Sequence, residues 1–95
     1  MQRRQLVFRV HAIRRMFLRQ VTPEDVAHVL DTGEVIEDYL DDRPYPSRLV
    51  LGYSGLRALH VVVADNQQDF ESVIITVYEP DPDLWEPGFK MRKQK

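Results

Sequence analysis

The chain lacks cysteine, has only four glycines, and contains no long run of hydrophobic residues. Without cysteine it has no disulfides, thiolate metal ligands or cysteine nucleophiles. Its longest apolar run, from Leu59 to Ala64, is interrupted by His60 and is far shorter than the roughly 20 residues that a membrane span needs. Arginines also interrupt the N-terminal region, where a signal peptide requires an apolar stretch. We therefore expect a soluble, cytoplasmic protein with no membrane association.

Glycine and histidine are too few and too scattered for two further kinds of site. The glycines occur singly, so the chain has no glycine-rich phosphate-binding loop, and it shows no serine-centred nucleophile motif. The three histidines lack the local spacing of a zinc site, and no metal or other cofactor is predicted. The acidic run between Glu34 and Asp42 resembles a cation site, but such runs are more often solvated edges or patches that meet a basic partner.

Charge is strongly segregated along the chain, although the net charge is only −2. The first 20 residues contain six arginines and no acid, whereas residues 24–42 contain eight acids and neither lysine nor arginine. Basic residues return near the C-terminus as Lys90, Arg92, Lys93 and Lys95. If these lie beside the N-terminal arginines, the two groups form a surface for a polyanion. The alternative is that acidic and basic segments neutralise one another within the fold.

Two helices are predicted before residue 34. Thr22 is a suitable N-cap for the second helix, Pro23 suits its first position, and Gly33 is predicted to be its left-handed C-cap. The first helix ends near residue 20 and has apolar residues at helical spacing, namely Val10, Ile13, Met16 and Phe17. On its polar side, His11, Arg15 and Arg19 follow one another at intervals of four, a stripe that either tracks phosphates or is simply solvated.

Beyond Gly33 the hydrophobic period changes to two, which is typical of β-strands. Short turns separate the predicted strands, including a tight hairpin at Ser54-Gly55, and therefore favour antiparallel neighbours. The fold class is α+β, with two N-terminal helices on a four-stranded antiparallel meander and a C-terminal tail or short helix held by Trp85 and Phe89. We expect one domain over residues 1–95, with a short extended segment at residues 6–8. The four strands are predicted at residues 35–40, 48–53, 57–64 and 72–79.

Three polar residues of the predicted strands suggest a chemistry. If the strand registers align, Arg48, His60 and Tyr78 converge on the sheet face opposite the helices. Such a set is suited to cleaving RNA without metal, with His60 as base or acid, Arg48 stabilising the phosphorane, and Tyr78 stacking on a base or donating a proton. The alternative for His60 is a buried, hydrogen-bonded core histidine, and for Tyr78 a packing role.

Several linked motifs resemble the bacterial domain-of-unknown-function family 4258 over roughly residues 8–80. They are His11-Ala12, Arg15-Met16 with Arg19, Glu24-Asp25-Val26, residues 33–39, residues 46–49 with Gly52, residues 60–63, and residues 75–80. Arg9 departs from the serine expected two positions before the histidine. The resemblance implies a fold similar to RelE-like and BrnT-like toxins, which are often found beside a small zinc-finger or helix-turn-helix antitoxin. The recurrent polar positions of the family fall on His11, Arg15, Arg48, His60, Tyr78 and Glu79.

The leading hypothesis is a toxin-like component of a toxin-antitoxin pair that acts as a metal-independent endoribonuclease on RNA. Its predicted catalytic residues are His60, Arg48, Tyr78 and Glu79. Its predicted RNA-binding residues are His11, Arg14, Arg15, Arg19, Lys90, Arg92 and Lys93. The competing hypothesis is a non-catalytic module that binds a protein partner through its exposed sheet face or its acidic segment. Low total basicity favours this second hypothesis, because free RNA-binding domains are usually far more basic.

Overall fold

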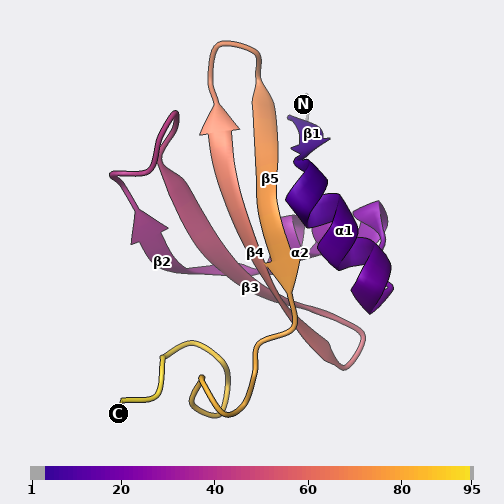
Figure 1. Ribbon diagram of the computed structural model, residues 1–95, viewed down its shortest axis with the longest axis vertical. Helices are drawn as coiled ribbons and strands as arrows, with labels where there is room; N and C mark the ends of the chain where they lie inside the picture. The colour runs from indigo at the N-terminus through magenta and orange to yellow at the C-terminus, as the bar shows by residue number, and fades with distance from the viewer. Residues whose placement is uncertain (1–3, 95) are drawn as a thin grey trace.

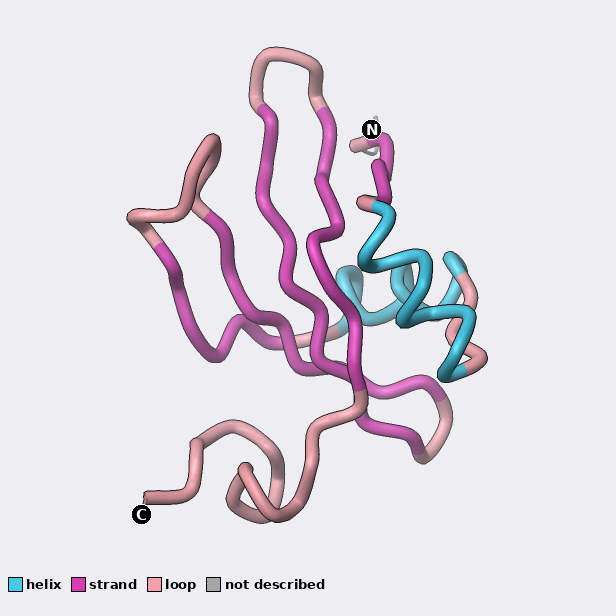
Figure 2. Tube along the Cα trace, in the orientation of Figure 1, coloured by secondary structure: helices cyan, strands magenta, loops and turns pink. Residues whose placement is uncertain are grey.

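A computed structural model describes residues 4–94, which form two helices and one mixed five-stranded sheet (Figures 1 and 2). The α+β class, with both helices near the N-terminus, is confirmed. In chain order the elements are β1 (Gln5–Phe8), α1 (Val10–Arg19), α2 (Pro23–Thr32), β2 (Glu34–Tyr39), β3 (Ser47–Ser54), β4 (Arg57–Asn66) and β5 (Glu71–Tyr78). Arg3 and Lys95 of the predicted basic segments lie outside the described residues.

The sheet has the strand order β1-β5-β4-β3-β2. Strands β2 to β5 form the predicted antiparallel meander, and β1 adds a fifth strand that runs parallel to β5. The prediction of only four strands was therefore incomplete. Its extended segment at residues 6–8 is part of β1, whose four residues are too few to display a period. Because β1 leads directly into α1, its pairing with β5 fixes this helix across one face of the sheet (Figure 1).

Helix α1 buries only one residue, Met16, of the apolar stripe that its spacing predicted. Ala12 and Met16 are buried against the sheet, whereas Val10, Ile13 and Phe17 of the predicted apolar stripe are exposed. The apolar residues extend over more of the helix surface than the sheet covers, and the buried side is the one that carries Ala12 and Met16. The exposed stripe is thus left without a partner among the described residues.

Helix α2 begins as its sequence predicts and ends differently. The Thr22 hydroxyl accepts a hydrogen bond from the Asp25 amide, and the Asp25 carboxylate accepts one from the Thr22 amide, which completes a capping box. Gly33 is not the predicted left-handed C-cap, because its φ of −82° and ψ of −178° are extended. Its amide donates to the carbonyl of Val29 and its backbone leads straight into β2. The left-handed cap occurs instead at Gln20, after α1.

The two faces of the sheet are covered by different parts of the chain. One face packs on α1 and α2 through buried aliphatic residues that include Val50, Val61, Val63 and Val77. The opposite face is partly covered by residues 81–94, hereafter the tail, which curls back beneath the sheet (Figure 1, yellow). Trp85 is only 2% exposed and holds the tail as predicted, and the tail contains no helix among its described residues.

Candidate functional site

His60 lies in the central strand β4 and faces the tail, away from the helices. Its side chain is fully buried, and both ring nitrogens have partners. Nε2 lies 2.9 Å from the carbonyl oxygen of Phe89, and Nδ1 lies 3.2 Å from the Tyr78 hydroxyl. Because a carbonyl only accepts, Nε2 carries the proton and Nδ1 accepts from Tyr78. The structure therefore places His60 and Tyr78 together on the face opposite the helices, as predicted, but with the tail over them.

An ordered row of side chains runs from His60 to the edge strand β2. The Trp85 ring meets the His60 ring edge-on at 4.5 Å between centroids, and the Arg92 guanidinium lies 4.6 Å from the centroid of the Trp85 ring. Arg92 also contacts Glu37, with its Nε 3.3 Å from Oε2. The Tyr39 hydroxyl donates to the other oxygen of Glu37 at 2.6 Å. The sheet thus presents four groups to the tail: the imidazole of His60, the phenols of Tyr39 and Tyr78, and the carboxylate of Glu37.

The environment fixes the protonation states in this row. Burial lowers the pKa of His60 and outweighs the hydrogen bond to Phe89 and the charge of Glu37. Burial and the hydrogen bond to Glu37 raise the pKa of Tyr39 to about 12, and burial also raises the pKa of Tyr78. At neutral pH the imidazole is therefore neutral and both phenols are protonated. With the tail in place, His60 has no exposed surface on which to meet a substrate.

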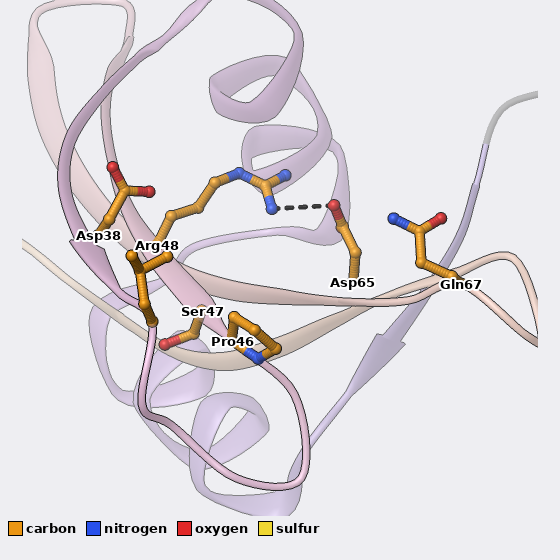
Figure 3. A pocket seen from close by; sticks show the side chains of 7 residues that line it. Asp38, Pro46, Ser47, Arg48, Asp65 and Gln67 are labelled. Atoms are coloured by element: carbon orange, nitrogen blue, oxygen red, sulfur yellow. Dashed lines mark hydrogen bonds and ion pairs between the residues drawn. The ribbon is translucent and has the colours of Figure 1, made fainter.

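Arg48 lies on the other face of the sheet, so the predicted convergence of Arg48 with His60 and Tyr78 is wrong. In the β3–β4 hairpin Arg48 pairs with Val63 and His60 pairs with Leu51, an odd offset that puts Arg48 and His60 on opposite faces. The Arg48 guanidinium instead contacts the Asp65 carboxylate at 3.0 Å (Figure 3). Ser72 donates to the other oxygen of Asp65. Arg48 is therefore held in an ion pair on the helix-facing side.

Two shallow cavities of about 290 and 280 Å³ flank the Arg48 side chain. The first is lined by Asp38, Ser47 and Asp65 among others, and Figure 3 shows the arginine reaching across it. The ion pair with Asp65 already neutralises Arg48, which disfavours an anionic ligand there. Glu79, the fourth predicted catalytic residue, is exposed after the end of β5 and lies 4.0 Å from Arg57. The four predicted catalytic residues thus do not form one site.

The predicted RNA-binding residues also divide into two groups. His11, Arg14, Arg15 and Arg19 are exposed on α1. Near the C-terminus, Lys90 contacts Glu34 at 2.8 Å and Arg92 contacts Glu37, so both lie against the acidic strand β2 and not beside α1. Lys93 is exposed in the same tail. The prediction of one joint basic surface was wrong, and the alternative of mutual neutralisation holds for these two ion pairs.

Sequence reasoning missed an apolar surface on α1, formed by Val10, Ile13, Phe17 and Leu18. Phe17 is 84% exposed and Leu18 is 75% exposed, and with Ile13 and Arg14 they line a shallow depression. The signal was present in the sequence: six of the ten residues of α1 are apolar, which is more than a single buried stripe needs. These four apolar residues, together with Arg14, Arg15 and Arg19, are hereafter the α1 surface.

A comparison with protein-family models matches the domain of unknown function DUF4258 over residues 8–79. The chain belongs to this family. No curated protein and no solved structure matches the chain. The DUF4258 match contains both helices and strands β2 to β5, together with His60, Tyr78 and Glu37. The tail lies beyond the matched region, so the contacts around His60 join the DUF4258 region to a segment outside it.

Two further observations describe this DUF4258 chain. No helix among the described residues is long and apolar enough to cross a membrane. In residues 4–94 no cluster of histidine and acidic side chains has the arrangement of a metal site, and this includes the acidic run between Glu34 and Asp42.

The stability of this DUF4258 chain is expected to rise with pH in a window that begins below pH 6.5. His60 has an ordinary pKa of 6.5 when unfolded and a lower pKa when folded, so between these values the unfolded chain binds more protons. The free energy of unfolding should therefore increase with pH there, by at most about 1.4 kcal/mol per pH unit, and its gain should be complete above pH 6.5. Among the groups facing His60, Tyr78 and Arg92 titrate far above this window, and the pKa of Glu37 is held below its ordinary value.

Urea denaturation across this pH range measures the effect. The His60→Gln variant is the matched control, because glutamine keeps a polar side chain and removes the titration. A wild-type slope equal to that of His60→Gln would contradict the assignment of the proton linkage to His60.

Proposed function

We propose that this chain is a non-catalytic binding module whose α1 surface binds an acidic amphipathic helix of a partner protein. The observation that carries the proposal is the exposure of Phe17 and Leu18 together with Val10 and Ile13 on one helix. Contiguous exposed apolar patches are rare on monomeric soluble proteins, and where they occur they commonly mark interaction sites. With the tail in place, the centre of the sheet face named in the competing sequence hypothesis is covered, whereas the α1 surface is exposed.

The charges around the α1 surface indicate the chemistry of its partner. Arg14 lines the same depression as Ile13, Phe17 and Leu18, and Arg15 and Arg19 are exposed on the same helix. None of these three arginines forms an ion pair within the described part of the chain. A second copy of the same surface would bring arginine against arginine. A helix with an apolar stripe flanked by carboxylates complements both features, and helix docking by apolar residues at positions three and four apart is a common mode of recognition.

The second candidate function is the toxin-like endoribonuclease of a toxin-antitoxin pair. It is supported by the four exposed basic residues of α1, which could follow RNA phosphates, and by the acid-free N-terminal segment. The geometry supports RNA binding more than RNA cleavage, because His60 is buried and Arg48 lies on the other face. In this candidate the acidic helix belongs to the antitoxin, and an adjacent reading frame for a small zinc-finger or helix-turn-helix protein would supply that partner.

Replacing Phe17 with serine is expected to weaken binding of an acidic amphipathic helix by about 30-fold, the loss typical of a central interface residue. The probe is a synthetic helix with leucines at positions i, i+3, i+4 and i+7 and glutamates on both flanks, measured by calorimetry. Leu56→Ser is the matched control, because Leu56 is fully exposed in the turn between β3 and β4. A probe with lysines in place of the glutamates should bind far more weakly.

Three outcomes contradict this proposal. One is equal affinity of the wild type, Phe17→Ser and Leu56→Ser for the acidic helix. Another is tight binding of a single-stranded RNA that is lost when Arg14, Arg15 and Arg19 become glutamine and is unchanged in Phe17→Ser, which would favour the RNA candidate. The third is self-association through α1, detected by sedimentation as a dimer that Phe17→Ser dissociates.

A further inference from the structure

The tail is seated on the sheet in the manner of a ligand. Internally it forms a small hairpin, in which Trp85 pairs with Arg92, the Glu86 amide donates to Met91, and the Lys93 amide donates to Leu84. Within the described residues, no backbone-to-backbone hydrogen bond joins this hairpin to the sheet. Its contacts with the sheet are made by side chains and by one carbonyl, that of Phe89.

Three chemically distinct contacts define what the sheet face accepts. The indole of Trp85 packs on the edge of His60, the carbonyl of Phe89 accepts from His60 Nε2, and the guanidinium of Arg92 reaches Glu37. The guanidinium is recognised as a planar group, because it stacks on Trp85 while its Nε and Nη2 face the two oxygens of Glu37. These are an aromatic, an acceptor and a cationic contact in a single row.

The sheet residues Glu37, Tyr39, His60 and Tyr78 lie in the DUF4258 region, whereas the tail groups that contact them come from outside that region. The connecting residues Asp81, Pro82 and Asp83 are exposed, so the hairpin can leave the sheet without unpairing a strand. Departure of the tail would uncover His60 and Tyr78 with Glu37 and Tyr39 beside them. A buried donor such as His60 Nε2 favours renewed occupation by another acceptor.

We propose that the sheet face formed by Glu37, Tyr39, His60 and Tyr78 is a binding site for a peptide segment of a partner protein, and that the tail occupies it as an internal ligand. The segment carries an aromatic side chain and an arginine that stack on each other, as Trp85 and Arg92 do. The carboxylates of Glu34 and Glu37 on the adjoining strand, which contact Lys90 and Arg92 of the tail, disfavour a polyanion at this face. This site is separate from the α1 surface and does not depend on the function proposed for it.

A full-length variant with a loosened tail tests the proposal. In Trp85→Ala with Arg92→Gln, both anchors are lost, and a synthetic peptide of residues 80–95 with the natural sequence is added in trans. We expect this peptide to bind the variant at least about tenfold more tightly than it binds the wild type, whose site is occupied. The NMR signals of the His60 ring should return toward their wild-type positions on binding. A peptide carrying the same two substitutions should not bind.

The matched protein control is Leu84→Ala with Lys93→Gln, two exposed tail residues, which should exclude the peptide as the wild type does. Failure of the natural peptide to bind the folded loosened variant would overturn the proposal. It would also be overturned if that variant instead forms a dimer by exchanging tails, or binds RNA at this face. If the double variant does not fold, Arg92→Gln alone replaces it, and binding no tighter than to the wild type overturns the proposal in the same way.

Discussion

Replacing His60 with alanine is expected to lower the free energy of unfolding by about 3 kcal/mol, within the range for truncating a large buried side chain. His60 is fully buried, so its removal leaves a cavity between Trp85 and Tyr78. It also leaves the carbonyl of Phe89 without its donor. Urea denaturation followed by circular dichroism measures the change, and equal slopes of the two transitions would show that the variant unfolds by the same process.

Two variants separate this loss from general effects of substitution. Tyr78→Phe removes only the hydroxyl that faces His60 and should cost about 1 kcal/mol. His28→Ala replaces an exposed histidine of α2 and should change stability by less than about 0.5 kcal/mol. A His60→Ala variant as stable as His28→Ala would contradict a structural role for the buried imidazole.

An RNA cleavage assay on the wild type, His60→Ala and Arg48→Ala distinguishes the binding module from the endoribonuclease. The binding module predicts that wild type, His60→Ala and Arg48→Ala all show background cleavage of RNA in the presence of a chelator. The endoribonuclease predicts that His60→Ala lowers cleavage by the 10²- to 10⁴-fold typical of a lost proton-transfer group, and that Arg48→Ala also abolishes most cleavage by removing charge stabilisation. Metal-independent cleavage by the wild type that is lost in both folded variants would therefore overturn the non-catalytic proposal.

Local sequence signals were sufficient for most of the fold. Thr22, Pro23 and Asp25 determine where α2 begins through contacts within one turn, and the period of two appears in β3, β4 and β5 because each is at least eight residues long. Strand β1 was described only as an extended segment, because its parallel pairing with β5 joins residues more than 60 positions apart. No local pattern encodes such a pairing.

Arg48 and His60 were wrongly predicted to share one face of the sheet because the pairing register of β3 and β4 was not determined. The β3–β4 turn pairs Ser54 with Arg57 around Gly55 and Leu56, and this pairing alone sets His60 opposite Leu51. Leu51 is an odd number of residues from Arg48, so His60 and Arg48 face opposite sides of the sheet. The sequence contained the glycine of this turn, but the site prediction assumed aligned registers without fixing the turn. The position of this turn would have assigned Arg48 and His60 to opposite faces of the sheet.

The tail contacts could not be predicted in the same way. Arg92 and Glu37 are 55 residues apart, and their ion pair depends on the path of a segment that follows the last strand. The segregated charges indicated that basic and acidic segments interact, but they did not show which segments do so. Nor did the spacing of apolar residues in α1 show that Ala12 is buried while Ile13 and Phe17 are exposed, because alanine contributes little hydrophobic area.

Replacing Gly33 with alanine is expected to lower the free energy of unfolding by about 2 to 3 kcal/mol, a cost typical of forcing an extra methyl group into a space that is already filled. Gly33 joins α2 to β2 in an extended conformation that alanine can adopt, so the cost comes from contact and not from φ. An added Cβ would lie 2.4 Å from the carbonyl oxygen of Val29 and 2.6 Å from that of Leu51. Both are backbone atoms, which cannot move without shifting α2 or β3.

Gly55→Ala provides the contrasting case in the same measurement. Gly55 has open space where a Cβ would be added, but its φ of 62° is left-handed, and alanine there should cost about 1 to 2 kcal/mol. Gly55→Asn should cost less, because asparagine tolerates this conformation. Gly33 also precedes the strand that carries Glu37 and Tyr39. When combined with the Trp85→Ala and Arg92→Gln substitutions, Gly33→Ala should therefore weaken binding of the tail peptide, whereas Gly55→Asn should not. A Gly33→Ala loss below that of Gly55→Ala would show that α2 and β3 separate freely at this point, contrary to the close approach of their backbones.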